Sequence, residues 1–483
     1  MLIRPPVSSL PAVYSTDVVE PRTSDPADPS RFPSPRILAR REHTLSRRSI
    51  DPNALKVLYR LEHSGFEACL VGGSVRDLLL GRQPKDFDVA TDARPGDVRR
   101  LFRNSRIIGR RFRLVHVYFR DGIVEVSTFR AGAERDADEP GDDGEDAGAG
   151  EALAGGEGET EDDGGDDAFI EDVLAEDNVF GSPPEDALRR DFTINALFYR
   201  IADFSVVDYV GGVEDLAKGL IRVIGDPNIR FREDPVRMLR ACEMAGRLCF
   251  RIDDDAQRAI RRWRGEMAKA SPARLVEELL EILRSGHAGR TFQWMLDLGL
   301  AESLLPELEA MIEAEDDGLG SLGRILPVLD RVVGGVRDAS DSLLLGCLLA
   351  PSVVLERHDR EEARRGPLSR SEVRSVVAST IDRLGERFSL SHARAKRTAS
   401  TLELFQRLCE PPPLDWTVRH VTSHPQWAEA VLLFEMLADA TGEGHEMLEA
   451  WRMAALEAQD VPPPGRTRKR RRGGRRARGH PRA

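Results

Sequence analysis

Two aspartates separated by one residue, Asp86 and Asp88, are the pair in this sequence best suited to chemistry. In an extended strand the side chains alternate between faces, so both carboxylates are expected on one side while Phe87 and Val89 point into a core. Two neighbouring anions repel each other, and a bound cation relieves that repulsion. Carboxylate pairs suit Mg²⁺, which shares its remaining positions with water and substrate phosphates. A pattern this short can also be a pair of solvated loop residues, so the surrounding sequence must decide between a metal site and a solvated pair.

A glycine-rich turn precedes the aspartates. An apolar run predicts a short strand that ends at this turn, and a helical pattern begins after it; the residues are Gly72, Gly73, Ser74, Arg76 and Asp77. Glycines let a backbone approach a ligand closely, and a helix start offers unpaired N–H groups to an anion. Taken alone, the stretch is better explained as a tight turn with Ser74 as N-cap and a surface Arg76–Asp77 pair. Followed by the two aspartates, it predicts a phosphate cradle beside a metal site.

A third acid, Glu125, stands among β-branched apolar residues in a predicted strand at 123–129. A charge without a partner is costly there. A metal shared with the two aspartates would supply a partner, and a cross-strand pair with Arg113 or Arg130 is the alternative. His116, in the preceding predicted strand, is interpreted as an ordinary strand residue because no neighbouring acid or nucleophile suggests a relay.

Four polar residues, Arg189, Arg190, Asp191 and Asn195, are embedded in an otherwise apolar segment. Buried polar groups need partners, and the triphosphate and ribose hydroxyls of a nucleotide would supply them. The alternative is a capped helix that carries both arginines on its surface.

A further acid and arginine lie at the start of a predicted helix, where Pro235 suits the first turn and Asp234 the N-cap. Asp234 and Arg237 are three residues apart and therefore face the same way. Together they could read the edge of a base, although a cap with a surface ion pair is the commoner meaning of this spacing. From Ser271 onward the pattern is helical, with Leu275, Leu279, Ile282 and Leu283 on one face and Gly286 at its end.

Charge is segregated along the chain, whose formal net charge is -12. Residues 134–177 contain twenty acidic residues and one basic residue, whereas residues 466–483 contain ten basic residues and no acid. The acidic run has few apolar residues and is expected to be a flexible insertion. The basic tail is suited to the phosphate backbone of RNA. A second basic stretch, residues 36–48, could either contact RNA or be a solvated lead-in.

The five cysteines, Cys69, Cys242, Cys249, Cys347 and Cys409, are scattered and odd in number. No disulfide framework or structural zinc site is indicated, so a reducing cytoplasm is expected. No apolar run approaches the length of a membrane span, so a soluble protein without a membrane partner is expected.

Four spaced motifs together resemble the class II nucleotidyltransferases, which comprise bacterial poly(A) polymerases and tRNA CCA-adding enzymes. They are Gly-Gly-Ser-Val-Arg-Asp, Lys-Asp-Phe-Asp-Val, Arg-Arg-Asp-Phe-Thr-Ile-Asn-Ala-Leu and Glu-Asp-Pro-Val-Arg-Met-Leu-Arg, in that order. The match runs from about residue 51 to residue 250 and is interrupted by the acidic insertion, which is longer and more acidic than the family pattern. It is specific because four motifs agree in order and spacing.

The resemblance implies an α+β fold, with a polymerase-β-like nucleotidyltransferase head followed by an all-α neck, body and tail. The expected division is a disordered, basic lead-in at 1–50, the head at 51–200 with a disordered insertion at 131–177, a base- and RNA-binding neck at 201–268, a helical RNA-binding body at 269–460, and a disordered Arg-rich tail at 461–483.

The resemblance also implies residue roles. By position, Asp86 and Asp88 match the ligands of a two-metal Mg²⁺ site, Glu125 the third acid, Arg189, Arg190, Asp191 and Asn195 the sugar and triphosphate motif, and Asp234 with Arg237 the base-reading pair. The implied substrates are ATP and RNA 3′ ends, and RNA-decay machinery is an implied partner.

Within the family, residues 103–117, the lead-in at 46–61 and the Arg-rich tail favour poly(A) addition over CCA addition. CCA or A addition to tRNA is the alternative. A hypothesis of another class is an RNA-binding regulator that has kept the fold without catalysis. Such a protein is expected to have lost one of the acidic ligands, and all of them are present.

Overall fold

The computed structural model describes residues 34–109, 113–131, 180–305, 320–335, 339–413 and 417–460. The first 33 residues, the acidic insertion from residue 132 and the Arg-rich tail, for which disorder is expected, lie outside these ranges. The chain divides into two compact units. Unit 1 runs to Arg230 and includes residues 251–256, and unit 2 comprises residues 231–250 and the chain from Gln257 onward.

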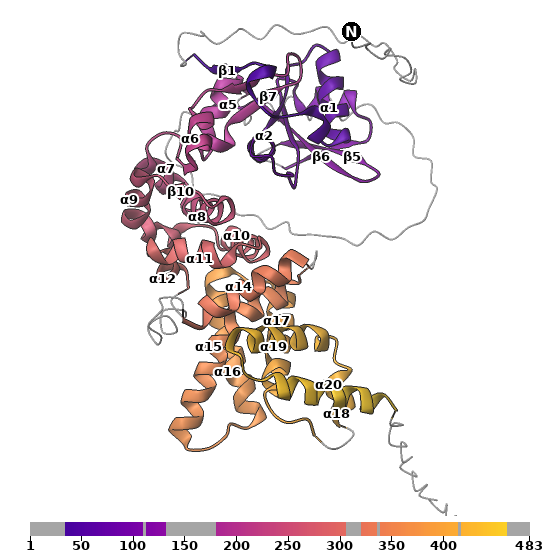
Figure 1. Cartoon of the computed structure of the whole chain (residues 1–483), viewed down its shortest axis with the longest axis vertical. Coiled ribbons are helices and arrows are strands. Elements are labelled where there is room, and N and C mark those ends of the chain that lie inside the picture. Colours follow the sequence, from indigo (N-terminus) through magenta and orange to yellow (C-terminus); the bar gives the residue numbers. More distant parts are fainter. Residues whose placement is uncertain are drawn as a thin grey trace, which may run out of the picture. The chain divides into compact units, whose positions relative to one another are not determined.

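A mixed sheet is the scaffold of unit 1 (Figure 1). It has eight strands in the order β1-β8-β7-β2-β3-β6-β5-β4. Its strands are β1 (Arg36–Leu38), β2 (Ala68–Val71), β3 (Asp88–Thr91), β4 (Ser105–Ile108), β5 (Leu114–Phe119), β6 (Gly122–Thr128), β7 (Leu197–Arg200) and β8 (Val206–Asp208). Strands β3 and β6 are parallel, and the other pairs are antiparallel. Every residue of the central strand β2 is buried, as expected for a continuous apolar run covered on both faces.

Short helices accompany this sheet. They are α1 (Pro52–His63), α2 (Gly73–Leu79), α3 (Pro95–Leu101), α5 (Pro183–Arg189), the 3₁₀ turn η4 (Thr193–Asn195), α6 (Gly212–Lys218) and the start of α7 (Pro227–Glu233). Asp51 caps α1 by accepting the backbone N–H groups of Asn53 and Ala54, as its position before an amphipathic pattern predicts.

Part of the expected disordered, basic lead-in is ordered. Strand β1 pairs with β8 at the edge of the sheet, and Leu45 and Ile50 are buried. The Arg47 guanidinium donates to the Tyr59 hydroxyl at 2.6 Å and lies over the ring of Phe204. Residues 36–50 therefore belong to the head, and so does β8, which lies beyond the expected head boundary at residue 200.

Unit 2 is built from helices (Figure 1). They are α8 (Val236–Leu248), the end of α9 (Asp254–Trp263), α10 (Pro272–Arg284), α11 (Ala288–Asp297), α12 (Leu300–Leu304), α14 (Gly320–Gly335), α15 (Asp341–Arg364), α16 (Arg370–Phe388), α17 (His392–Leu408), α18 (Thr417–Thr422), α19 (Trp427–Thr441) and α20 (His445–Asp460). The apolar face predicted for α10 is buried. The fold class, a sheet-containing head followed by a helical remainder, is confirmed.

The expected all-α neck differs in one detail. Two-residue strands β9 (Leu220–Ile221) and β10 (Arg251–Ile252) pair in parallel and tie residues 251–256 to unit 1. Among the described helices, none is both long enough and apolar enough to cross a bilayer.

Candidate functional site

The glycine turn and Asp88 lie side by side because β2 and β3 are antiparallel neighbours. Val71, the last residue of β2, pairs with Asp88, the first residue of β3. Gly72 has a φ of +72°, and a Cβ at this position would lie 3.3 Å from Arg190 Nη1 and 4.0 Å from Asp88 Oδ2. Glycine is therefore required both for the left-handed backbone and for the close approach of two charged groups.

Two of the three acids predicted from the sequence, Asp86 and Glu125, act on the third, Asp88. Asp86 is exposed in the loop just before β3 rather than within the strand, and Phe87, expected in the core, is only half-buried. Strand β6 places Glu125 beside the start of β3, because Val89 and Val126 are register partners. Burial, with smaller contributions from the charges of Glu125 and Asp86, raises the pKa of Asp88 to about 6. A bound cation would relieve this repulsion.

Glu125 faces His116 across the β5–β6 hairpin, with Nε2 and Oε2 3.5 Å apart. The interpretation of His116 as an ordinary strand residue therefore missed its partner. The Asp121-Gly122 turn predicts a hairpin, and counting back from it sets position 116 opposite position 125. Of the two alternative partners, Arg130 is close enough for the Glu125 charge to act on its guanidinium.

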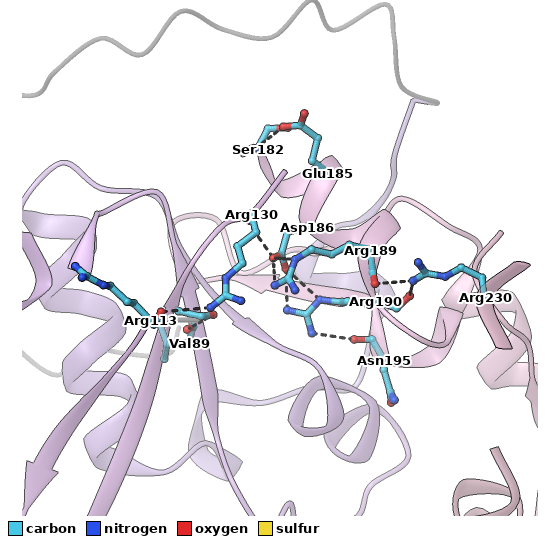
Figure 2. A network of polar contacts seen from close by, with 11 residues as sticks. Val89, Arg113, Arg130, Ser182, Glu185, Asp186, Arg189, Arg190, Asn195 and Arg230 are labelled. Atoms are coloured by element: carbon cyan, nitrogen blue, oxygen red, sulfur yellow. Dashed lines mark hydrogen bonds and ion pairs between the residues drawn. The ribbon is translucent and has the colours of Figure 1, made fainter. Parts of the chain in front are cut away.

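Asp186 binds both predicted arginines, and the sequence reasoning missed it (Figure 2). Its carboxylate is almost fully buried and accepts from Arg189 Nη2 at 2.6 Å and from Arg190 Nη2 at 2.9 Å. The sequence signal for this contact was the position of Asp186, three residues before Arg189 and four before Arg190, which puts all three side chains on one helix face. Arg230 Nη2 donates to the carbonyls of Arg189 and Arg190 at 2.6 and 2.8 Å, so it satisfies acceptors at the end of α5.

Two arginines against one carboxylate leave net positive charge at this place. The Arg190 guanidinium also lies beside Gly72 and lowers the pKa of Asp88 against the effect of burial. The positive charge is therefore positioned next to the acids, an arrangement that suits a ligand with several phosphates.

A buried arginine connects the glycine turn to the second motif. Arg76 is 2% exposed, donates from Nε to Asp77 Oδ1 at 2.8 Å and from Nη1 to Asn195 Oδ1 at 2.6 Å. Asn195 Nδ2 donates to Asp191 Oδ1 at 3.3 Å, and Arg190 Nη1 donates to the Asn195 carbonyl at 3.3 Å. The alternative of a surface Arg76–Asp77 pair is wrong, because Arg76 is inside.

Ser74 is not the N-cap of the helix after the turn. Gly72 occupies that position without a side-chain hydrogen bond, and the buried Ser74 hydroxyl instead donates to the Val71 carbonyl at 2.8 Å. Helix α2 is only seven residues long, so a phosphate there would depend on the bare glycine backbone of Gly72 and Gly73 and on Arg190 rather than on a helix dipole.

The second expected pair, Asp234 and Arg237, lies at the start of α8 in unit 2. The helix begins one residue later than predicted, at Val236, whose N–H donates to Asp234 Oδ1 at 3.3 Å. Arg237 lies 3.5 Å from Glu233 Oε2 and 4.0 Å from Asp234 Oδ2. Arg274 Nη2 contacts Asp234 Oδ2 at 3.0 Å. Glu233 and Arg274 were not foreseen, and both side chains of the predicted pair are about four-fifths buried.

The acids could hold a magnesium ion that completes its coordination with other ligands. In the described part of the chain, no three His, Cys, Asp or Glu side chains converge to hold one ion. Magnesium commonly takes only one or two carboxylates and completes its shell with water and phosphates. Asp86 and Asp88 can supply such a pair, whereas a site with Glu125 as a third ligand is not assembled.

Comparisons with known proteins agree with this geometry. Residues 68–222 match the family model of the poly A polymerase head domain, and residues 249–312 match the model of a probable RNA and SrmB-binding site of polymerase A. The poly(A) polymerase I of Salmonella typhi is 48% identical over 277 residues, which cover 56% of this chain and 54% of the relative. A CCA-adding enzyme of Lactobacillus helveticus is 36% identical over 253 residues, which cover 52% of this chain and 54% of the relative.

A solved structure resembles a larger share of the chain. The Bacillus stearothermophilus CCA-adding enzyme in complex with CTP aligns with a TM-score of 0.55 at 23% identity, and the alignment covers 84% of this chain and 83% of that structure. This similarity shows the fold. The chain spans about half the length of the curated relatives it matches.

Proposed function

We propose that this chain, whose head belongs to the poly(A) polymerase head-domain family, is a template-independent polynucleotide adenylyltransferase that adds AMP from ATP to RNA 3′ ends. The family resemblance read from the four motifs is confirmed by the match at residues 68–222. The observation that carries the chemistry is the meeting of Asp88, the bare backbone of Gly72 and the Arg190 guanidinium at one point. The higher identity to a poly(A) polymerase than to a CCA-adding enzyme favours poly(A) addition.

In this mechanism the RNA 3′-hydroxyl attacks the α-phosphate of ATP in line. The new bond joins the 3′ oxygen to the α-phosphorus, the bond between the α-phosphorus and its bridging oxygen breaks, and pyrophosphate leaves. Asp86 and Asp88 would hold Mg²⁺, which when bound lowers the pKa of the attacking hydroxyl and stabilises the charge on the transferring phosphate. No side-chain nucleophile is needed.

The remaining residues bind and orient the nucleotide. Arg189 and Arg190 share Asp186 and so keep positive charge for the triphosphate. Asn195 already uses its side-chain amide on Arg76 and Asp191. We therefore assign Asn195 first to holding the buried Arg76 in place, and a ribose contact would require one of these hydrogen bonds to exchange.

One assay separates the candidate functions. The purified full chain is given an oligo(A) primer and a tRNA that lacks its terminal CCA, each with ATP and with CTP separately. Poly(A) polymerase activity predicts repeated AMP addition to oligo(A) and no use of CTP. Addition of CMP to the tRNA would replace this proposal by CCA addition, and RNA binding without incorporation of either nucleotide would indicate the non-catalytic regulator.

Arg237→Ala is expected to reduce the preference for ATP over CTP about tenfold or to raise the KM for ATP, because a polar site rejects substrates that leave its groups unpaired. Arg237 is mostly buried beside Glu233 and Asp234. The matched control is Arg247→Ala on the same helix, whose arginine pairs with Glu243. Steady-state kinetics with both nucleotides test the assignment, and unchanged kinetics in Arg237→Ala would remove base reading from this residue.

We further propose that the Arg-rich tail, residues 461–483, contacts the RNA phosphate backbone, and that the protein acts in the cytoplasm with RNA-decay machinery as a partner. Truncation before Pro464 is expected to weaken RNA binding and to flatten its dependence on salt, since each neutralised phosphate releases counterions. Affinities measured across a salt series give this slope. A slope identical to that of the full chain would show that the tail makes no RNA contact.

A further inference from the structure

A pocket in unit 2 lies between the C-terminal end of α8 and helix α11. Its volume is about 310 Å³, and its walls carry Cys249, Phe250, Arg290, Gln293, Trp294 and Asp297. The aromatic rings of Phe250 and Trp294 are half-buried, and the polar side chains are exposed. The pocket therefore combines an apolar floor with a polar rim that is open to solvent.

The rim offers donors and acceptors in a fixed arrangement. Gln293 Nε2 donates to Asp297 Oδ1 at 2.9 Å, which leaves the amide oxygen of Gln293 as an acceptor. Arg290 Nη1 contacts the Cys249 thiol and the Gly246 carbonyl, which holds the guanidinium at the edge. Aromatic faces with such groups around them bind the unstacked bases of single-stranded RNA.

Helix α9 adds positive charge beside this rim. Its exposed arginines in unit 2 are Arg258, Arg261 and Arg262. Arg261 Nη2 donates to the carbonyl of Asp297 at 3.4 Å, so this face of α9 adjoins the pocket. The guanidinium of Arg262 lies over the ring of Trp263, 4.9 Å from its centroid. Arginines flanking an aromatic pocket are placed to contact the phosphates on either side of a bound base.

We propose that this pocket binds one base of the RNA strand, stacked on Trp294, while the α9 arginines contact the adjacent phosphates. The proposal rests on the proposed function, because RNA is the polymer to be extended. The pocket is separate from the Asp234–Arg237 pair, since twelve helical residues from Arg237 to Cys249 span about 18 Å. A nucleotide base is preferred to a protein side chain because the α9 arginines lie beside the rim, where the phosphates that flank a bound base would carry the opposite charge.

The test compares a base-bearing ligand with a base-free one. Binding of the full-length Trp294→Leu variant is measured to a short oligo(A) and to an abasic ribose–phosphate oligomer of the same length. We expect oligo(A) affinity to fall about tenfold, the order of one lost stacking interaction, and abasic affinity to stay unchanged. The control is Trp427→Leu in α19, a half-buried tryptophan outside the pocket, with both affinities unchanged. An equal loss for both ligands, or no loss, would overturn the proposal.

Two further measurements keep the outcome clear if Trp294→Leu folds poorly. Gln293→Ala removes an exposed rim group and is expected to weaken oligo(A) binding selectively. In the unmodified protein, the exposed Cys249 is expected to react more slowly with iodoacetamide when oligo(A) is bound, but not when the abasic oligomer is bound. If Cys249 reacts at the same rate with either ligand bound, the pocket does not bind a base.

Failure of this proposal can be told apart from failure of the proposed function. If the unmodified chain adds AMP to oligo(A) and Trp294→Leu binds oligo(A) as well as the control does, only the pocket assignment falls. If the unmodified chain binds oligo(A) and adds no nucleotide, the enzymatic function falls, while selective loss of oligo(A) binding in Trp294→Leu still supports the pocket.

Discussion

Asp88→Asn is expected to abolish AMP incorporation and, at the same time, to stabilise the metal-free protein. The carboxylate lies beside the Gly72 backbone and Arg190, where it would share an ion with the substrate phosphates. Loss of several kcal/mol of transition-state stabilisation corresponds to at least about a thousandfold in rate. The asparagine keeps the shape of the side chain and removes its charge.

The gain in stability follows from the direction of the pKa shift. Burial and the neighbouring acids raise the pKa of Asp88 from 3.8 to about 6, so the ionised form is disfavoured in the folded state. The resulting loss in the free energy of unfolding is absent below about pH 4, grows between about pH 4 and pH 6, and is complete above about pH 6. Asp88→Asn removes it, and we expect a gain of about 1–2 kcal/mol at pH 7 after allowing for the partial exposure of the group.

Thermal unfolding in EDTA, measured across this pH range, tests the stability, and incorporation from ATP tests the activity. Asp86→Asn is the matched control, because Asp86 is exposed: it should lose activity with little change in stability. Mg²⁺ should raise the unfolding temperature of the unmodified protein more than that of Asp88→Asn. Retained incorporation, or a metal-free Asp88→Asn protein less stable than the unmodified one, would contradict the role given to this carboxylate.

The parts of the site that could be predicted from the sequence are those set by local spacing. The Gly72 turn and Asp88 belong to strands that are close in sequence and pair directly, so two motifs separated by a short loop were enough to place them together. The Asp51 cap and the buried face of α10 were predicted for the same reason. Capping and helical periodicity act within a few residues and leave a clear pattern.

The parts that could not be predicted depend on distant pairings or on competing partners. Strand β1 pairs with β8, some 170 residues later in the chain, and no local pattern specifies such a partner. Asp186 stands three and four residues before the two arginines, but ordinary surface ion pairs share that spacing, and its burial is what distinguishes it from them. Ser74 had two possible partners: as an N-cap its oxygen would accept from a backbone N–H, but its hydroxyl donates to the Val71 carbonyl instead.

Gly212→Ala is expected to destabilise unit 1 and to displace Asn195. Gly212 begins α6, which packs against η4, the turn that ends at Asn195. A Cβ at Gly212 would lie 2.1 Å from the Thr193 carbonyl oxygen and 2.8 Å from its carbon. Backbone cannot swing aside as a side chain can, so α6 and η4 must separate. Overpacking of this kind costs about 2–3 kcal/mol.

The same movement should reduce AMP incorporation, because Thr193 Oγ1 bonds Asp215 Oδ2 of α6 at 2.8 Å and η4 carries the amide that holds Arg76. The matched control is Gly385→Ala within α16, where a Cβ meets nothing within 4 Å and should stabilise by about 0.5–1 kcal/mol. The two glycines lie in different units. Gly212→Ala should therefore lower the urea concentration at which unit 1 unfolds, and Gly385→Ala should raise the urea concentration at which unit 2 unfolds. If Gly212→Ala unfolds at the same urea concentration as the unmodified chain, α6 does not hold η4 in place, and the nucleotide motif must be positioned by the Asp186 and Arg76 contacts alone.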